Sequence, residues 1–420
     1  MLTDMCNLRC PYCFASEFVG KKASEITMED FKKALEFIAD GKEKIDKFGL
    51  IGGEPLLHSR FAEILELLLA DDRIQTVSIY TNGLLMHRYM DLLKNQKVHL
   101  LINYNPPEIL GEENEKKLYQ NLKQLYEVKK EDALHAIRLG INIYKPDFSY
   151  EYIIPVLQEF GFDNIRFSIT VPNSSIASLQ DAHAYYQSIK ESFLKFYKRI
   201  LSMGVLPMFD CNKIPVCLFS VEELEPIFYA FLKYPEIVMN ERHFLLSEWS
   251  RCSPVIDIQT NLKAVRCFGL SKESEVSISD FKGLEELETY YDKRFDQKAF
   301  EIPYQVRCEK CSAREWKQCM GSCLSYRVKE NEIACQKQKE DVWQRESLYE
   351  RYLKCYLKDR TFRGITDEIL NIEIFHAFVE KLQKETYSRT EIEPIYEKVV
   401  TYKKAMKQAK EDNKKHRMES

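Results

Sequence analysis

The chain has 420 residues, which is long enough for roughly two or three domains with a sizeable core. Its hydrophobic content of 45%, charged content of 30% and formal net charge of −4 are ordinary for a globular protein, and they give no reason to expect a nucleic-acid partner. No stretch is apolar for long enough to span a bilayer, and no signal peptide is visible, so we expect a cytoplasmic protein with no membrane partner.

Strand-like and helix-like segments alternate up to about Phe167. A helix is predicted over residues 27–39, because Thr27 is a suitable N-cap and Phe31 and Leu35 share one helical face. The other predicted helices cover residues 61–68, 113–129 and 150–159, and the predicted strands cover residues 48–51, 77–80, 98–103, 137–144 and 164–170. Repeated strand–helix units predict an α/β fold with a parallel sheet, open or closed into a barrel.

The pattern changes after about residue 200. Residues 205–335 contain nine of the thirteen cysteines and few long periodic segments. We therefore predict three parts, which are an α/β domain over residues 1–200, a small cysteine-rich domain over residues 201–340 and a charged helical C-terminal tail over residues 341–420. Clustered thiols in a long chain without a secretion signal indicate metal binding rather than disulfides.

The first cysteine motif is Cys6-Asn-Leu-Arg-Cys10-Pro-Tyr-Cys13, which places three thiols on one loop. Three thiolates can hold three irons of a [4Fe–4S] cube and leave the fourth iron open for an exchangeable ligand. The alternative is half of a zinc site, but no fourth cysteine or histidine follows nearby.

A second motif, Ile51-Gly-Gly-Glu-Pro55, follows a predicted strand. Paired glycines let a ligand approach the backbone closely, and Glu54 and the backbone carbonyls can accept hydrogen bonds from an ammonium group. Taken alone, the motif would be a tight turn after a strand. Its place one strand–helix unit after the three cysteines indicates a ligand site.

These two motifs make the chain resemble the radical S-adenosylmethionine (SAM) superfamily, through CxxxCxxC at residues 6–13 and GGEP at residues 52–55. The resemblance implies a partial (β/α)6 TIM-like barrel and a cluster whose open iron binds SAM. An electron from the cluster, supplied by a flavodoxin or ferredoxin type of donor, would split SAM to give a 5′-deoxyadenosyl radical that takes a hydrogen atom from the substrate. The residues implied are Cys6, Cys10 and Cys13 for the cluster, Gly52, Gly53, Glu54 and Pro55 for the SAM amine, and Tyr12 for the adenine.

Further SAM contacts are expected on the strands. Apolar residues alternate with polar ones along residues 137–144 and 164–170, so the polar set should face the barrel interior. Each polar residue also has a plainer explanation, in which it satisfies a backbone group or an ion pair. The candidates are Asn142, Arg166 and Ser168, together with Asn103, which stands where related enzymes often place a polar SAM contact.

Seven later cysteines could close one four-thiolate site and most of a second, whereas a zinc ribbon would leave three of them idle. Their spacing resembles the SPASM domain, the auxiliary-cluster domain of many radical SAM enzymes. Leu262 stands where that domain usually has a glycine, and the middle spacing is seven residues rather than five. By resemblance the distal [4Fe–4S] cluster would use Cys308, Cys311, Cys319 and Cys335, and the inner one Cys252, Cys267 and Cys323, with Cys211, Cys217 or an open iron as the fourth position.

Most SPASM-type enzymes modify peptides or proteins, so the leading hypothesis is peptide natural-product maturation by cross-linking or oxidation of a side chain. The alternative enzyme activity is radical dehydrogenation or rearrangement of a small metabolite or sugar, and a third possibility is a non-enzymatic electron carrier. Phe268 stands where sulfatase-maturing relatives have a general-base Asp, which argues against that branch. The few residues before Cys6 leave no room for a leader-binding domain, so a separate protein or the tail would bind a leader peptide, if there is one.

Overall fold

The computed structural model describes most of the first 300 residues. The described ranges are residues 1–20, 24–170, 182–210, 212, 214, 218–219, 223, 252, 255–297, 299 and 323–325. The helical tail predicted over residues 341–420 lies outside them, and the division of the chain into three domains stays a prediction.

A parallel six-stranded sheet forms the centre of the fold, with its strands in the order of the sequence. All five predicted strands are confirmed to within a residue or two. The sixth strand was not predicted, because it is short, contains Pro207 and lies beyond the alternating region. The strands are β1 (Phe48–Leu50), β2 (Val77–Thr81), β3 (Val98–Asn103), β4 (Ile137–Ile143), β5 (Asn164–Ile169) and β6 (Leu206–Phe209).

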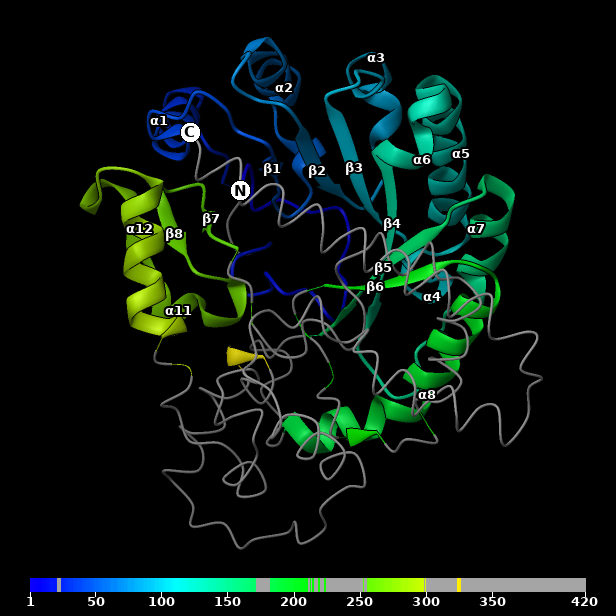
Figure 1. Ribbon diagram of the computed structural model, residues 1–420. Coiled ribbons are helices and arrows are strands. Elements are labelled where there is room, and N and C mark those ends of the chain that lie inside the picture. Colours follow the sequence, from blue (N-terminus) through cyan, green and yellow to red (C-terminus); the bar gives the residue numbers. More distant parts are fainter. Residues whose placement is uncertain are drawn as a thin grey trace, which may run out of the picture.

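Helices cover one face of this sheet (Figure 1). They are α1 (Met28–Ala39), α2 (Phe61–Ala70), α3 (Met90–Leu93), α4 (Pro107–Leu110), α5 (Glu112–Lys129), α6 (Ala133–Ala136), α7 (Ile154–Phe160) and α8 (Ala182–Ser202). The short turns of helix between them are η1 (Pro55–Leu57), η2 (Met86–Arg88), η3 (Lys130–Asp132) and η4 (Glu151–Ile153). In the described ranges, no helix combines the length and the apolar run that crossing a membrane requires.

The two faces of the sheet differ in the way the sequence predicts. Along β3, buried residues such as Leu100 and Ile102 alternate with the half-buried Leu101 and Asn103. The buried set packs against the helices, because an apolar face must be covered, and the half-buried set faces a cavity.

The N-cap predicted for α1 is confirmed, since Thr27 Oγ1 accepts a hydrogen bond from the backbone N–H of Asp30 at 3.0 Å.

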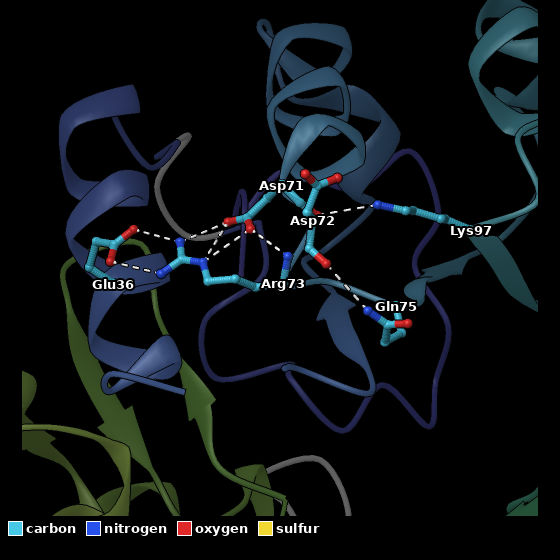
Figure 2. Close-up of polar contacts among 6 residues, drawn as sticks. All are labelled: Glu36, Asp71, Asp72, Arg73, Gln75 and Lys97. Atoms are coloured by element: carbon cyan, nitrogen blue, oxygen red, sulfur yellow. Dashed lines mark hydrogen bonds and ion pairs between the residues drawn. The ribbon is translucent and has the colours of Figure 1, made fainter. Parts of the chain in front are cut away.

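Polar contacts hold the rim of the barrel between α1, α2 and β2 (Figure 2). The Arg73 guanidinium donates to both carboxylate oxygens of Glu36 on α1, at 2.8 and 3.2 Å, and to Asp71 at 2.7 Å. Lys97 Nζ donates to the carbonyl oxygens of Leu69 and Asp71 at 3.2 and 3.3 Å. A cation at the carboxyl end of a helix is favourable, so Lys97 supports the end of α2.

A smaller unit after residue 255 packs beside α1 (Figure 1). Its antiparallel strands are β7 (Asp257–Ile258), β8 (Lys263–Val265) and β9 (Val276–Ser277), and its helical segments are η6 (Phe268–Leu270), α11 (Ser271–Ser274), η7 (Ile278–Asp280), α12 (Leu284–Tyr291) and η8 (Asp292–Asp296). Phe37 of α1 is in one apolar cluster with Leu287 and Tyr291 of α12. Asp40 at the end of α1 accepts a hydrogen bond from the Glu285 N–H at 3.0 Å, in the first turn of α12. These contacts fix the smaller unit to the first helix of the barrel.

The start of the chain lies against the turn that follows β1. The backbone N–H groups of Gly53 and Glu54 donate to the carbonyl oxygens of Thr3 and Met5, both at 2.7 Å. The two backbones approach so closely that a Cβ atom on Gly52 would stand 2.8 Å from the Thr3 oxygen, and one on Gly53 would overlap the Met5 carbonyl. Glycine is therefore needed at positions 52 and 53 for the two backbone segments to approach this closely.

We predict that Gly53→Ala lowers the free energy of unfolding by about 1–3 kcal/mol, because the added methyl group forces residues 3–5 away from the turn. Denaturant unfolding monitored by circular dichroism measures the change. The matched control is Gly49→Ala, whose Cβ would meet a Tyr80 ring carbon at an ordinary 3.5 Å. Equal stabilities of the two variants would contradict the role of this contact.

Candidate metal and cofactor site

A single cavity of about 1630 Å³ brings together most of the predicted site. Its wall includes all three cysteines of the first motif and three later cysteines, together with predicted SAM-binding residues on the turn after β1 and on the strands. The predicted site residues that line it are Cys6, Cys10, Tyr12, Cys13, Gly52, Gly53, Asn103, Asn142, Arg166, Ser168, Cys252, Cys267 and Cys323. Cys211, Cys217, Cys308, Cys311, Cys319 and Cys335 lie outside the described residues.

The thiols of the first motif are half-buried on one loop. The Leu8 N–H donates to the Cys6 sulfur at 3.4 Å, and the Cys10 thiol lies 3.8 Å from Asn105 Oδ1. Burial raises the pKa of Cys6 to about 11 and that of Cys10 to about 12. Because a metal ligand must be a thiolate, metal binding here would displace the protons of these thiols.

Polar side chains form a connected row on the cavity floor. Tyr12 donates its hydroxyl hydrogen to Asn105 Oδ1, and Asn103 Nδ2 donates to the same oxygen at 3.2 Å. Asn142 Nδ2 in turn donates to Asn103 Oδ1 at 2.6 Å, and the ring of Tyr12 packs on that of Tyr144 with centroids 4.8 Å apart. Asn105 was not predicted from the sequence, although its position two residues after Asn103 would have placed it on the same side of the chain.

Arg166 and Ser168 share a carboxylate at the other side of the floor. Arg166 forms an ion pair with Asp210, and Ser168 Oγ donates to Asp210 Oδ2 at 2.8 Å. Asp210 follows β6, and its backbone N–H donates to the Phe167 carbonyl at 2.9 Å. Asp210 thus holds the side chains of Arg166 and Ser168 in place. This matches the alternative explanation for these residues, in which each satisfies an internal partner and not a ligand.

Glu54 stands behind the cavity wall. Its carboxylate is 1% exposed and accepts hydrogen bonds from Thr81 Oγ1 at 2.7 Å and from the N–H groups of Asn82 and Leu56 at 2.8 and 3.2 Å. Burial raises its pKa to about 7. Among the described residues of this turn, Gly52 and Gly53 line the cavity, and neither Glu54 nor Pro55 does.

The cysteines of the smaller unit form the second group. Cys267 follows β8 by two residues, and its pKa is raised to about 12 by burial and, to a lesser extent, by the charges of Cys323 and Cys252. The three described thiols that the resemblance assigns to the inner cluster thus line the same cavity. Next to them, Arg266 Nη1 donates to the Cys252 sulfur at 3.4 Å.

Within the described ranges no three Cys, His, Asp or Glu side chains converge closely enough to hold one metal ion. A single zinc ion draws its sulfurs to about 2.3 Å from one point, whereas a cubane cluster takes each thiolate on a different iron. The three thiols of Cys6, Cys10 and Cys13 on one cavity wall are the donor type that the cluster of the first motif requires.

Direct contacts join the two cysteine loops. The Phe268 ring, next to Cys267, packs against the rings of Phe14 and Phe18 with centroids 4.9 and 5.9 Å apart. Ser271 Oγ donates to Glu17 Oε2 at 3.1 Å. The loop that follows the first cysteines is therefore held against the turn that carries Cys267, which fixes the width of the cavity.

Comparison with known proteins identifies the family of the chain. The sequence profile of the radical SAM superfamily matches residues 1–105. GTP 3′,8-cyclase of Alkaliphilus oremlandii is 34% identical over 304 residues, which cover 59% of this chain and 91% of the relative. The chain belongs to the radical SAM superfamily.

Two further proteins are similar to this radical SAM protein, one over a short stretch of sequence and one over most of the fold. Human molybdenum cofactor biosynthesis protein 1 is 36% identical, but only over 95 residues, which cover 22% of this chain and 15% of the relative. The crystal structure of Streptococcus suis SuiB bound to S-adenosylmethionine superimposes with a TM-score of 0.50 at 15% identity, over 82% of this chain and 74% of SuiB. This likeness confirms the α/β partial-barrel fold, and membership of the superfamily implies one [4Fe–4S] cluster and SAM.

Asn103→Ala should weaken SAM binding by about tenfold, because the loss of one hydrogen-bonding side chain costs about 1–1.5 kcal/mol. Calorimetric titration of the reconstituted radical SAM protein with SAM under anaerobic conditions measures the dissociation constant. The control is Asn164→Ala on β5, which lies outside the cavity wall and whose amide bonds only its neighbour Asp163 among the described residues. If both variants bind SAM as the parent protein does, Asn103 is not a cofactor contact.

Proposed function

We propose that this protein uses SAM and an auxiliary iron–sulfur cluster to modify a substrate bound between two cysteine groups. The observation that carries the proposal is that Cys6, Cys10 and Cys13 line the same cavity as Cys252, Cys267 and Cys323. A substrate in that cavity would meet both metal sites at once. An electron carrier has no need of such a chamber, so the enzyme hypothesis is favoured.

The residues present suit the groups that the proposal requires. With its cluster and SAM bound, the first site supplies a 5′-deoxyadenosyl radical, while an external donor of the flavodoxin or ferredoxin type supplies the electron. Gly52 and Gly53 present backbone at the cavity wall, and Tyr12, Asn103 and Asn142 form the polar floor beside the cysteine loop. These residues would bind and orient SAM, and the paired Arg166 and Ser168 would shape the far side of the floor.

The turn before β8 supports a SPASM-like second domain. Leu262, five residues before Cys267, has a φ angle of +61°, the left-handed region that favours glycine. Its N–H donates to the Gln259 carbonyl at 3.1 Å, and its carbonyl accepts from the Ile278 N–H at 3.1 Å. A glycine is usual at this position in SPASM domains, so the backbone keeps the shape that the motif requires although the residue has changed.

We propose a peptide or protein side chain as the leading substrate, with cross-linking or oxidation as the reaction. Seven cysteines after residue 250, apart from Cys355, are enough for two auxiliary clusters, the complement typical of the peptide-modifying SPASM enzymes.

The second candidate is a small metabolite or sugar, and one finding favours it. The relative from Alkaliphilus oremlandii that is 34% identical over 91% of its length is named GTP 3′,8-cyclase, and GTP is a small molecule. A radical dehydrogenation or rearrangement would use the same cavity and the same first cluster. Small-molecule enzymes of this kind often carry one auxiliary cluster, so the number of clusters separates the two candidates.

Cys10→Ala should abolish SAM cleavage and remove about four irons per chain, because the first cluster loses one of its three ligands. Anaerobic assays for 5′-deoxyadenosine and for iron measure both effects. Cys355→Ala is the matched control, since no other cysteine stands at a ligand spacing from it, and it should retain iron and activity. Unchanged 5′-deoxyadenosine production by Cys10→Ala would refute the first site.

The fully reconstituted protein should contain about twelve irons per chain if two auxiliary cubane clusters are present, and about eight if there is one. Cys319→Ala should then lower the iron content while SAM cleavage continues uncoupled from product. Iron and sulfide analysis together with Mössbauer spectroscopy provides the count. A value near eight would shift the assignment to the small-molecule candidate, and a value near four would exclude both auxiliary clusters.

A further inference from the structure

Arg266 is a charged side chain buried in the second cysteine group. It follows β8 directly and precedes Cys267, and its side chain is 0% exposed. Burying a guanidinium group costs free energy unless charged and hydrogen-bonding partners replace the water. The reason for its place must therefore be found among the groups that it contacts.

Two partners account for the guanidinium in the described part of the chain. Nε donates to Asp296 Oδ2 at 3.1 Å, and Nη2 donates to Asp296 Oδ1 in a two-pronged ion pair. The remaining arm, Nη1, points the other way and donates to the Cys252 sulfur at 3.4 Å. Cys252 and Asp296 both line the cavity, so the guanidinium bridges two parts of its wall.

A purely structural role explains the contacts of Arg266 with Asp296 but not its contact with Cys252. An ion pair that braces η8 against β8 needs the two arms that Asp296 takes, and leaves no reason for the third arm to meet a sulfur atom. A thiolate bound to iron is a negatively charged acceptor, and a hydrogen bond from a charged donor to such an acceptor is among the stronger ones.

We propose that Arg266 raises the reduction potential of the inner auxiliary cluster by donating a hydrogen bond to the Cys252 sulfur. The inference rests on the proposed function, because it requires a cluster on Cys252, Cys267 and Cys323. Hydrogen bonds to the sulfurs and nearby positive charge stabilise the reduced cluster, which carries one more negative charge than the oxidised form. Arg266 is a positioning residue that acts through Cys252 and does not touch the substrate.

The test is an anaerobic redox titration followed by electron paramagnetic resonance. It uses the full-length Cys10→Ala protein, in which the SAM-binding cluster is absent and the auxiliary signals remain. The signal that disappears in Cys10→Ala/Cys267→Ala belongs to the inner cluster. Adding Arg266→Gln should raise the oxidised-to-reduced ratio of that cluster at least tenfold at a fixed ambient potential. A tenfold change corresponds to a fall of about 59 mV in the reduction potential of a one-electron couple.

Matched variants separate the sulfur contact from a general loss of charge. Lys263 of β8 forms a solvent-accessible ion pair with Glu275. Lys263→Gln removes that cation and should leave the reduction potential of the inner cluster unchanged. Arg266→Gln/Asp296→Asn removes both halves of the buried pair, and its potential should stay low because the donor to Cys252 is still missing. If Arg266→Gln fails to hold iron, Arg266→Lys decides, since it keeps the charge with a single donor group and should give a lower potential than arginine.

The outcomes distinguish the inference from its basis. A Cys10→Ala protein without any signal that depends on Cys267 would overturn the proposed auxiliary cluster and with it the inference. A signal that is present, depends on Cys267 and keeps its potential in Arg266→Gln, or in Arg266→Lys where the glutamine variant holds no iron, would overturn the inference alone.

Discussion

The site depends on the backbone contact between the first residues of the chain and the turn after β1. Hydrogen bonds from Gly53 and Glu54 to the carbonyls of Thr3 and Met5 end directly before Cys6, so they set where the cysteine loop begins. Glu54 anchors the turn from behind through Thr81 and Asn82. The glycines and the glutamate of this motif therefore act first on the protein itself, since they fix how the cysteine loop lies relative to the floor of the barrel.

Much of the barrel could be predicted, because the alternation of apolar residues is a direct consequence of the two faces of a parallel sheet. The strands through β5 and the N-cap at Thr27 follow from local pattern. Strand β6 is too short and contains a proline, and the three strands of the smaller unit have two or three residues each, so no periodic signal exists for them.

At the site, residue types could be predicted and partners could not. Spacing identified the cysteines, but the side chains that organise the floor, Asn105 and Asp210, meet their partners only through the fold. Arg266 is the clearest example. A lone arginine beside a cysteine has no distinctive pattern, and its pairing with Asp296 spans 30 residues. Glu54 illustrates the reverse case, since its motif was found but its buried carboxylate takes partners, Thr81 and Asn82, that the motif does not reveal.

The contact between Glu17 and Ser271 joins residues 254 positions apart and has a consequence for assembly. Contacts between distant segments form late, because long loops must close before they can be made, and domains fold as units while the chain emerges from the ribosome. The first three thiols are synthesised before the barrel that supports them, and the cavity wall opposite them arrives only after that barrel is complete. Insertion of the first cluster therefore has a period in which its loop is open to a donor on one side, and docking of the smaller unit ends that period.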